Sequence, residues 1–379
     1  MRVDLLDYDL PTERIAQTPP DEREGARLLV VDPTGPDNAT LTDAAIVDLA
    51  TVIPERALLV VNDTRVLAAR LLAKKPDTGG KVEIFLVRKE GPGSIERAMP
   101  EGPPVVVEGE IWRALGKASK PLRFDRDLEV SDDLSVRILG RAEDDGLLRV
   151  LLMSSGRIED AIENYGQIPL PPYIKRSPTE DDRERYQTVF ARHLGAVAAP
   201  TAGLHLSRAL LGKLAIAGCE VASITLHVGL GTFQPVTVDD LDQHPMHDEA
   251  YEVGRAAARA IVAAKKEGRP IVAVGTTVVR ALEAAARVSP PGELLAPSSG
   301  TTNLLLQPGE ELRVVDALLT NFHLPKSTLL ALVASFIGVK NLHAAYAHAI
   351  RESYRFYSYG DAMLIRRRIT PAEAKSTAR

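Results

Sequence analysis

The stretch Val272-Ala-Val-Gly-Thr-Thr-Val-Val-Arg280 decides the fold class, because it reads as a buried strand, a tight turn and the start of a helix. From about Ser154 onward, strands and helices alternate along the chain. Such alternation predicts a layered α/β domain. The predicted strands of this part are Val221–Leu226, Ile271–Val274 and Val314–Leu319.

Three helices are predicted in the same part of the chain. Ser207 caps the first, and the alanine-rich residues Arg255–Lys266 form the second. The third is indicated by apolar residues that recur at the helical period from Leu329 to Ile337. Near the N-terminus we expect a helix at Leu41–Ala50 and a buried strand at Leu58–Val61.

The character of the sequence changes between residues 65 and 150. Short β-like runs follow one another there, separated by clusters such as Gly91-Pro-Gly93. Closely spaced strands without helical patterns between them indicate a small barrel or sandwich. We therefore predict a discontinuous α/β domain, residues 1–64 and 151–379, with an inserted all-β barrel at residues 65–150. The strands expected in the barrel are Val66–Leu72, Lys81–Arg88, Val105–Val107, Leu134–Leu139 and Leu147–Leu152.

The composition is ordinary for a soluble protein of two domains. The chain has 379 residues, of which 45% are hydrophobic and 26% are charged. It has no run of 18 apolar residues, and its first residues lack the apolar segment of a secretory signal, so we expect no membrane span. Cys219 is the single cysteine, which excludes a disulfide within the chain and favours a cytoplasmic protein.

Charge and histidine are unevenly distributed. The net charge of -5 disfavours a globally basic nucleic-acid binder. A local basic stripe in the predicted barrel is either a solvated face or a contact for phosphates. All eight histidines lie between His193 and His348, so acid–base chemistry is expected in the second half of the chain. The stripe consists of Arg113, Lys117, Lys120, Arg123 and Arg126.

The stretch quoted first also carries a candidate anion site. At the helix start, the backbone N–H groups of Thr276 and Thr277 would face a carboxylate or phosphate, and Arg280 would add a bidentate contact. The plainer interpretation is a threonine-capped helix with a surface arginine.

A second candidate segment runs from Ile224 to Val238. It reads as a strand that delivers His227 into a Gly229-x-Gly231 turn followed by Thr232. Glycines there allow the backbone to approach a ligand closely. A dinucleotide-type loop is disfavoured, because a third glycine and an immediate helix are missing.

Other segments place polar residues beside strands or turns. Asn321, His323 and Lys326 follow an apolar strand, where α/β proteins bind ligands. Thr201 and His205 lie in a run of small residues, although a lone histidine among apolar neighbours is more often a core residue.

Three more segments complete the set of candidates. His244 and His247 are spaced like metal ligands but lie in a loop without a third ligand, so we expect no metal. The aromatic run from Tyr354 to Asp361, which includes Tyr359, would stack a purine or pack in the core as a buried strand. A polar turn, Asn62-Asp-Thr-Arg65, ends an apolar strand.

Taken together, these segments resemble the S-adenosylmethionine:tRNA ribosyltransferase-isomerase family of the queuosine pathway. The resemblance extends from Leu10 to Ile365, and the order of its motifs makes it specific. The sequence departs from the family at Ala68, where proline is frequent, and at Thr301–Gly309, which lacks the usual aromatic residues. The matching residues are 62–66, 80–83, 168–174, 186–189, 195–205, 226–229, 231–235, 246–247, 274–277 with Arg280, 320–325, 354–356 and 358–361.

The resemblance implies an activity and a fold. Members transfer the ribosyl group of S-adenosylmethionine to 7-aminomethyl-7-deazaguanine at the tRNA wobble position and isomerise it, which gives epoxyqueuosine and releases adenine and methionine. The family fold is a discontinuous α/β domain with a small β-barrel. S-adenosylmethionine is a co-substrate, and we expect no cofactor, no metal and a monomer.

This chemistry requires two or three titratable groups. The candidates are His227, His323 and Asp361, followed by His205 and then the group His247-Asp-Glu249. On the same resemblance, the helix start at Thr276 would hold the methionine carboxylate, and aromatic residues near Tyr354 would stack a base. Basic barrel residues would contact tRNA phosphates. The expected substrate-binding residues are Asn62, Arg65, Thr201, Gly229, Gly231, Thr232, Thr276, Thr277, Arg280, Asn321, Lys326, Tyr354 and Tyr359.

Two other functions remain open at this point. One is an S-adenosylmethionine methyltransferase that uses Gly229-x-Gly231, and the other is a nonenzymatic RNA-binding protein that uses the barrel. The first lacks a helix after its glycines, and the second leaves the histidine-rich half unexplained.

Overall fold

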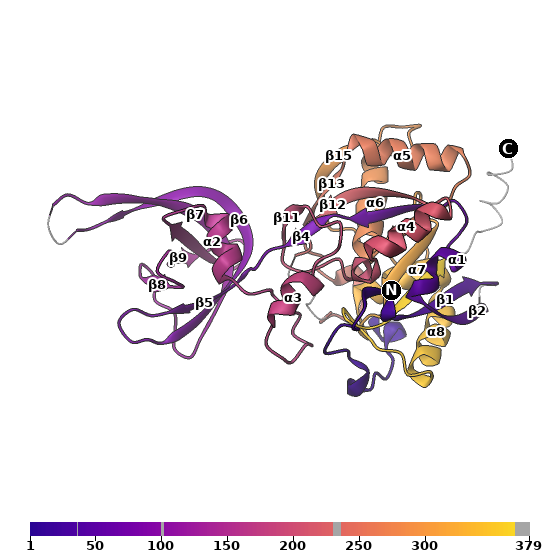
Figure 1. Cartoon of the computed structure of the whole chain (residues 1–379), viewed down its shortest axis with the longest axis horizontal. Helices are drawn as coiled ribbons and strands as arrows, with labels where there is room; N and C mark the ends of the chain where they lie inside the picture. Colours follow the sequence, from indigo (N-terminus) through magenta and orange to yellow (C-terminus); the bar gives the residue numbers. More distant parts are fainter. Residues whose placement is uncertain (36, 100–101, 230–235, 368–379) are drawn as a thin grey trace.

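The protein consists of two parts arranged along its long axis (Figure 1). A computed structural model describes residues 1–35, 37–99, 102–229 and 236–367. Strands form a barrel at one end of the molecule, and a large sheet covered by helices forms the other end. Between the two parts, β4 (Thr64–Val66) pairs in parallel with β11 (His193–Ala196).

Within the described residues, a nine-stranded sheet in the order β15-β13-β12-β3-β14-β16-β17-β1-β2 forms the centre of the α/β part. The central strands β12, β3, β14 and β16 run parallel. All residues of β3, β14 and β16 are buried, as expected for parallel strands covered on both faces. The strands are β1 (Arg27–Pro33), β2 (Ala39–Ala45), β3 (Leu58–Asn62), β12 (Glu220–Leu226), β13 (Glu249–Val253), β14 (Ile271–Val274), β15 (Ser298–Thr302), β16 (Ala317–Asn321) and β17 (Ala362–Arg366).

Alternate residues of β3 pack into two apolar clusters. Leu58 and Val60 belong to one cluster, and Leu59 and Val61 belong to another that also contains Leu210. Because successive side chains of a strand point to opposite faces, the sheet has an apolar layer on each side. The predicted mixed α/β class is confirmed.

Most of the predicted helices of the α/β part are present. The Ser207 hydroxyl accepts the Leu210 N–H at 2.9 Å and caps α4 as expected, and α5 has the predicted bounds. The first residue of α6 is Thr276, but its N-cap is Gly275 at φ 95°, not a threonine. The helices are α1 (Leu49–Val52), α2 (Ile158–Tyr165), α3 (Glu180–Arg185), α4 (Arg208–Ile216), α5 (Arg255–Lys266), α6 (Thr276–Val288), α7 (Thr328–Ile337) and α8 (Val339–Arg351), with 3-10 turns at Val3–Leu6, Thr12–Arg14, Arg23–Gly25, Ile46–Asp48, Thr201–His205 and Leu241–Gln243.

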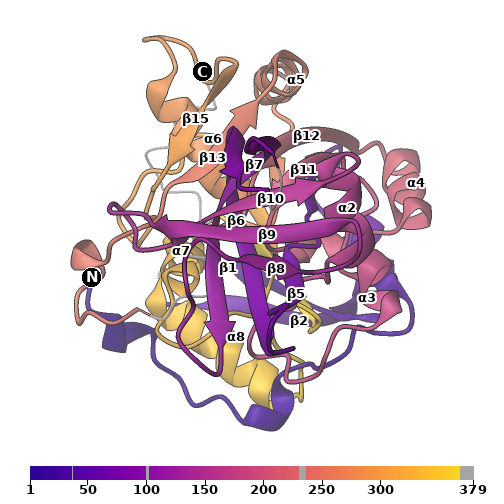
Figure 2. The same cartoon turned by 90° about the vertical axis from the view of Figure 1, so that its left-hand side faces the viewer.

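The barrel closes through the strand order β10-β7-β6-β5-β8-β9. Figure 2 looks at the molecule from the barrel side. A separate apolar cluster, which includes Ile84, Trp112 and Val150, fills the barrel. Its strands are β5 (Arg70–Lys74), β6 (Lys81–Arg97), β7 (Val105–Ala118), β8 (Asp127–Glu129), β9 (Leu134–Arg141) and β10 (Leu148–Ser154).

Two local predictions differ from the structure. The first half of the helix expected at Leu41–Ala50 is strand β2, because residues 39–45 pair with β1 in an antiparallel register, whereas its second half is helical, with a 3-10 turn at Ile46–Asp48 and the start of α1. Gly91-Pro-Gly93 does not end a strand, because β6 continues through it against β7 with register shifts that accommodate the extra residues. No single helix in the described residues is long and apolar enough to span a membrane. Helices α7 and α8 meet these criteria only as a pair, and they are bent by 110° at their junction.

Candidate active site

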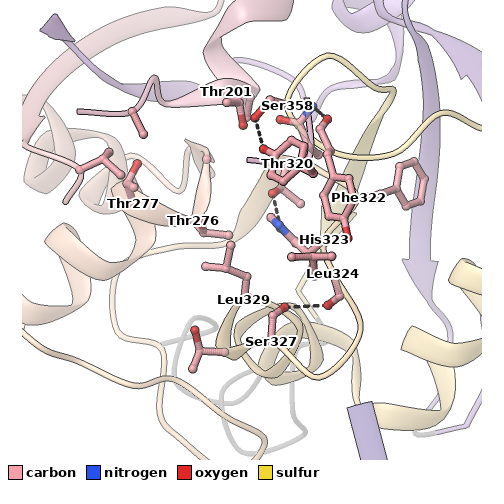
Figure 3. A pocket seen from close by; sticks show the side chains of 18 of the residues that line it. Thr201, Thr276, Thr277, Thr320, Phe322, His323, Leu324, Ser327, Leu329 and Ser358 are labelled. Atoms are coloured by element: carbon pink, nitrogen blue, oxygen red, sulfur yellow. Dashed lines mark hydrogen bonds between the residues drawn. The ribbon is translucent and has the colours of Figure 1, made fainter. Parts of the chain in front are cut away.

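A cavity of about 580 Å³ opens at the carboxyl ends of the central parallel strands (Figure 3). The segments that follow β14 and β16 line it, together with the turn that contains Thr201. This edge of an α/β sheet is where ligands bind. The cavity brings together six of the predicted residues, namely Thr201, Thr276, Thr277, Asn321, His323 and Lys326.

The N-terminus of α6 presents unpaired backbone donors to the cavity. In the described part of the chain, the N–H groups of Thr276 and Thr277 donate to no other group, whereas the Gly275 N–H donates to the Leu319 carbonyl at 2.8 Å. Gly275, Thr276 and Thr277 all line the cavity. The first N–H groups of a helix carry its positive end, so this wall is suited to a carboxylate or phosphate.

His323 is a buried residue held by three neighbours. Its Nε2 lies 2.9 Å from Thr320 Oγ1, its N–H donates to the Tyr346 hydroxyl at 3.0 Å, and its carbonyl accepts from the Tyr8 hydroxyl. Burial lowers the pKa of His323 to about 3. The imidazole is therefore neutral near pH 7 and a weak base, which suits it to a hydrogen bond with a substrate better than to uptake of a proton.

Asn321 connects the cavity to His205. Its side-chain N–H₂ donates to the carbonyls of Tyr357 at 3.1 Å and Asp361 at 3.4 Å, and lies 3.0 Å from His205 Nε2. The two carbonyls fix the orientation of the amide, with its N–H₂ group toward the His205 ring. Burial, followed by the charges of Arg23 and Arg355, lowers the pKa of His205 to about 4.

His227 lies beside the cavity, next to the strands between the two parts. Its Nδ1 is 2.8 Å from Thr64 Oγ1, and its ring packs on Gly195 so closely that an added Cβ would be 2.8 Å from the ring. Burial, and then His193, lowers the pKa of His227. The next residue, Val228, lines the cavity. His227 itself does not line the cavity, whereas Val228 and His323 do.

The glycine turn after His227 is only partly described. The Gly229 N–H donates to Glu249 Oε1 at 3.1 Å. Gly231 and Thr232 lie outside the described residues.

Asn62 and Arg65 lie outside the cavity lining. The Asn62 side chain bridges β3 to β12 by accepting the Leu226 N–H at 3.0 Å and donating to the Leu226 carbonyl at 2.9 Å. Arg65 forms an exposed ion pair with Glu163 at 2.8 Å. Lys326 lines the cavity, but its ammonium group pairs with Asp7 at 2.9 Å.

Arg280 does not reach the anion site predicted for it. Its guanidinium group forms a buried ion pair with Glu249 and donates to the carbonyls of Leu304 at 3.0 Å and Thr302 at 3.3 Å. The sequence places Arg280 one turn into the helix. It does not indicate the buried partner Glu249, because this residue lies on β13, far from Arg280 in the sequence. This contact replaces the expected bidentate contact with a ligand.

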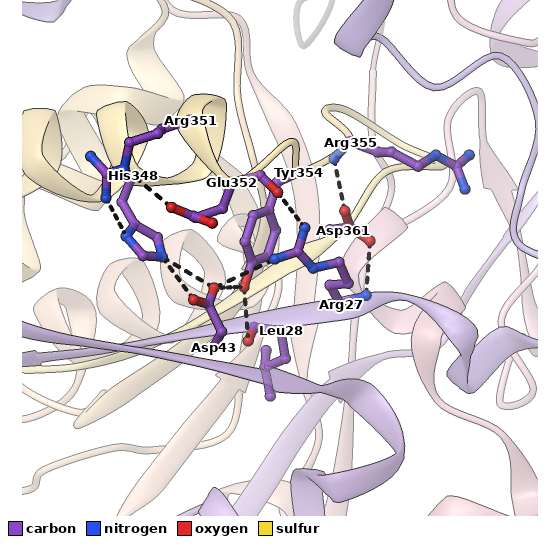
Figure 4. Close-up of polar contacts among 9 residues, drawn as sticks. All are labelled: Arg27, Leu28, Asp43, His348, Arg351, Glu352, Tyr354, Arg355 and Asp361. Carbon is purple, nitrogen blue, oxygen red and sulfur yellow. Dashed lines mark hydrogen bonds and ion pairs between the residues drawn. The ribbon is translucent and has the colours of Figure 1, made fainter.

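Asp361 is engaged in holding its own loop (Figure 4). Its carboxylate accepts the N–H of Arg27 at 2.8 Å and that of Arg355 at 2.7 Å. Burial raises the pKa of Asp361, although these hydrogen bonds lower it. Asp361 does not line the cavity, so the structure favours a positioning role over the predicted contact with the reacting atoms.

Tyr354 and Tyr359 are core residues. The Arg27 guanidinium lies 3.7 Å from the centre of the Tyr354 ring, and the Tyr354 hydroxyl donates to Asp43 (Figure 4). The Tyr359 hydroxyl donates to Asp182 at 2.7 Å. Neither ring lines the cavity, so neither is placed to stack a base there.

Two other tyrosines line the cavity: Tyr357 belongs to the aromatic run that was predicted to stack a base, whereas Tyr173 was not selected from the sequence. Tyr173 and Tyr357 stack with ring centres 4.5 Å apart, and the Tyr173 hydroxyl lies 2.5 Å from Ser358 Oγ. Burial raises the pKa of Tyr173 to about 12. Tyr173 belongs to the motif Pro171-Pro-Tyr173 within the matched segments, which was the available signal.

In the ranges that the structure describes, no group of three or more His, Cys, Asp or Glu residues is arranged to hold a metal ion. His244 and His247 line a small recess beside the main cavity, together with Glu249 and Arg280.

Comparisons with known proteins identify the family of the chain. The family described as "Queuosine biosynthesis protein" matches residues 3–365, and the chain belongs to this family. The chain is similar to proteins named S-adenosylmethionine:tRNA ribosyltransferase-isomerase. In Sorangium cellulosum (strain So ce56) the relative is 55% identical, with 97% of this chain and 99% of the relative covered, and in Geotalea uraniireducens (strain Rf4) it is 47% identical, with 96% and 100% covered.

A solved structure is also similar. The crystal structure of an S-adenosylmethionine tRNA ribosyltransferase from Thermotoga maritima superposes with a TM-score of 0.52 at 31% identity, and the match covers 95% of this chain and 99% of that one.

Proposed function

We propose that this protein transfers the ribosyl group of S-adenosylmethionine to 7-aminomethyl-7-deazaguanine at the tRNA wobble position and isomerises it, with release of adenine and methionine. The relatives' names specify S-adenosylmethionine, tRNA and the transferase and isomerase activities. The observation that carries the proposal is the cavity at the strand ends, where a helix N-terminus, a neutral histidine and stacked aromatic rings line one space.

The size and walls of the cavity support two small substrates side by side. A volume of about 580 Å³ lies in the usual range for ligand sites. The unpaired N–H groups of Thr276 and Thr277 would bind the methionine carboxylate, without Arg280. Tyr173 and Tyr357 would supply the flat surface for adenine or the deazaguanine, in place of Tyr354.

The histidines would supply the proton transfers. The sulfonium group acidifies the neighbouring C5′ hydrogens, so a base can remove one of them, and the departing adenine requires a proton. His323 lines the cavity in the neutral form that a proton acceptor requires, and its pKa near 3 makes it a weak base. His227, beside the cavity, would serve the second transfer, and His205 would hold Asn321 in place.

We also propose that the barrel is an inserted domain that contacts tRNA. Its apolar cluster is separate from those of the α/β part, and its strands are consecutive in the chain from Arg70 to Ser154. Limited proteolysis between the two parts tests this division: a stable barrel fragment is expected, and its absence would contradict an independent domain.

One assay distinguishes this function from its competitors. The protein is incubated with S-adenosylmethionine and tRNA that carries the aminomethyl base. Adenine and free methionine in equal amounts are expected. S-adenosylhomocysteine would indicate a methyltransferase, and binding without turnover would indicate an RNA-binding protein.

A further inference from the structure

The barrel contains a second large cavity, which we call the barrel cleft. It has a volume of about 840 Å³ and lies between the turn after β5 and the segment that joins β7 to β8. Leu122, Leu128 and Ile138 contribute its apolar surface. The barrel cleft shares no lining residue with the cavity of the candidate active site, so it is a separate feature of the molecule.

Cations dominate the lining of the barrel cleft. Asp77 pairs with Arg126 at 2.6 Å, and Asp127 pairs with Arg97 and Arg137, each at 2.6 Å. The acidic groups of the lining are therefore already neutralised by arginines. The cations that line the cleft without an ion pair or side-chain hydrogen bond in the described part of the chain are Lys75, Lys81, Lys120 and Arg123.

These four cations gather at one concave surface of a chain whose net charge is -5. Like charges around one concave surface repel one another, and the concavity focuses their field outward. Elsewhere on the barrel, Arg113 contacts Glu90, Asp144 and Asp145, whereas Lys74 and Lys117 form no ion pair with a described residue and do not line the cleft. Of the basic stripe noted in the sequence, Lys120 and Arg123 thus face the cleft without partners, whereas Arg113 is neutralised.

We infer that the barrel cleft binds the phosphodiester backbone of RNA. This inference rests on the proposed function and adds the residues that would hold the tRNA substrate away from the reacting base. Flexible lysines supply point charges that position a phosphate backbone without reading its sequence. Phe124 follows Arg123 in the chain and is 48% exposed, so an aromatic face is available for an unpaired base.

The test is a triple variant, Lys81→Ala, Lys120→Ala and Arg123→Ala, in the full-length protein. We expect its affinity for tRNA to fall by at least about tenfold at 0.1 M salt, and the slope of log affinity against log salt to decrease in magnitude by about 2–3. The KM for tRNA rises, while the affinity for S-adenosylmethionine, measured without tRNA, stays unchanged.

A matched control removes the same charge from paired positions of the barrel. Arg88→Ala, Arg141→Ala and Arg149→Ala remove side chains that contact Asp145, Gly146 and Glu90, and none of them lines the cleft. The control should change tRNA affinity and salt slope much less. If both triple variants lose tRNA affinity equally, the effect is explained by net charge alone and the inference is wrong.

Further outcomes separate this inference from the proposed function. If the wild type shows turnover and the cleft variant has an unchanged KM for tRNA, the inference is wrong and the proposed function stands. If the wild type binds tRNA tightly without turnover, the proposed function is wrong. The salt dependence of tRNA binding by the cleft variant then tests the cleft on its own. Inorganic phosphate is the second probe: if the variant loses phosphate binding but keeps its tRNA affinity, the cleft is a small-anion site and the inference is wrong.

Discussion

Arg280 and Glu249 form an ion pair inside the α/β part, with side-chain exposures of 9% and 4%. The other carboxylate oxygen of Glu249 accepts the Gly229 N–H at 3.1 Å. Helix α6, which presents its N-terminus to the cavity, is thereby tied to Gly229, two residues after His227. Neither member of the pair lines the cavity of Figure 3.

Removing one member of this pair should be costly. Arg280→Ala leaves the Glu249 carboxylate buried without its partner, and we expect the free energy of unfolding to fall by about 3–5 kcal/mol. Urea denaturation measures this change. The control is Lys340→Ala, which breaks a pair with Asp37 whose side chains are 70% and 59% exposed and should cost less than about 1 kcal/mol. Similar losses in the two variants would contradict a structural role for the buried pair.

Gly195 should be intolerant of a side chain because of its contact with His227. A Cβ at residue 195 would lie 2.8 Å from the imidazole ring and would displace it from Thr64. We expect Gly195→Ala to reduce turnover by about 10–100-fold through misplacement of His227. Gly212→Ala, in α4 with no atom within 4 Å of the new Cβ, is the control and should retain full turnover. Full activity of Gly195→Ala would exclude a role for the position of His227.

The buried histidines should make stability depend on pH. The pKa of His323 falls from 6.5 to about 3 on folding, so the unfolded chain binds more protons below pH 6.5. The stabilisation is fully present above pH 6.5 and is lost as the pH falls toward 3. In denaturation at pH 4–7, His323→Ala should show a slope of unfolding free energy against pH that is shallower by up to about 1.4 kcal/mol per unit. Parallel profiles for wild type and variant would refute the lowered pKa.

Both candidate proton-transfer residues can be tested by substitution. His323→Ala and His227→Ala should each lower adenine release by about 10²–10⁴-fold while the circular dichroism spectrum stays native. His343→Ala is the control, because His343 bonds the Leu5 carbonyl at 2.8 Å and does not line the cavity. Near-normal adenine release by either variant would remove that residue from the mechanism.

The periodic segments of the fold could be predicted from sequence. Strand β14 and helix α5 have the expected bounds. Burial on both faces gives β14 a continuous apolar run, and burial of one face gives α5 apolar residues at the helical period. Strand β2 could not be predicted as a strand, because its pairing with β1 is a tertiary contact and its own residues are mostly half-exposed or exposed.

Much of the candidate site was predictable because polar residues closely follow a strand. His323 and Thr276 come two residues after β16 and β14, and parallel strand ends meet at one edge of the sheet. The sequence could not show that Asp361 and Tyr354 lie outside the cavity lining, because their partner, Arg27, is at the other end of the chain. No local sequence pattern predicts such a contact. The stacking of Tyr173 on Tyr357 is likewise a tertiary contact that the sequence does not indicate.

The sheet topology sets the order in which the protein can fold during synthesis. Strand β3 ends at Asn62, but its neighbours β12 and β14 begin at Glu220 and Ile271, and β1 pairs with the late strand β17. The barrel, by contrast, is built from hairpins of consecutive residues. On the ribosome the barrel is therefore expected to fold first, while the apolar strand β3 stays unpaired until β12 and β14 have been synthesised. A chain released before Ala362 should lack β17, the parallel neighbour of β1.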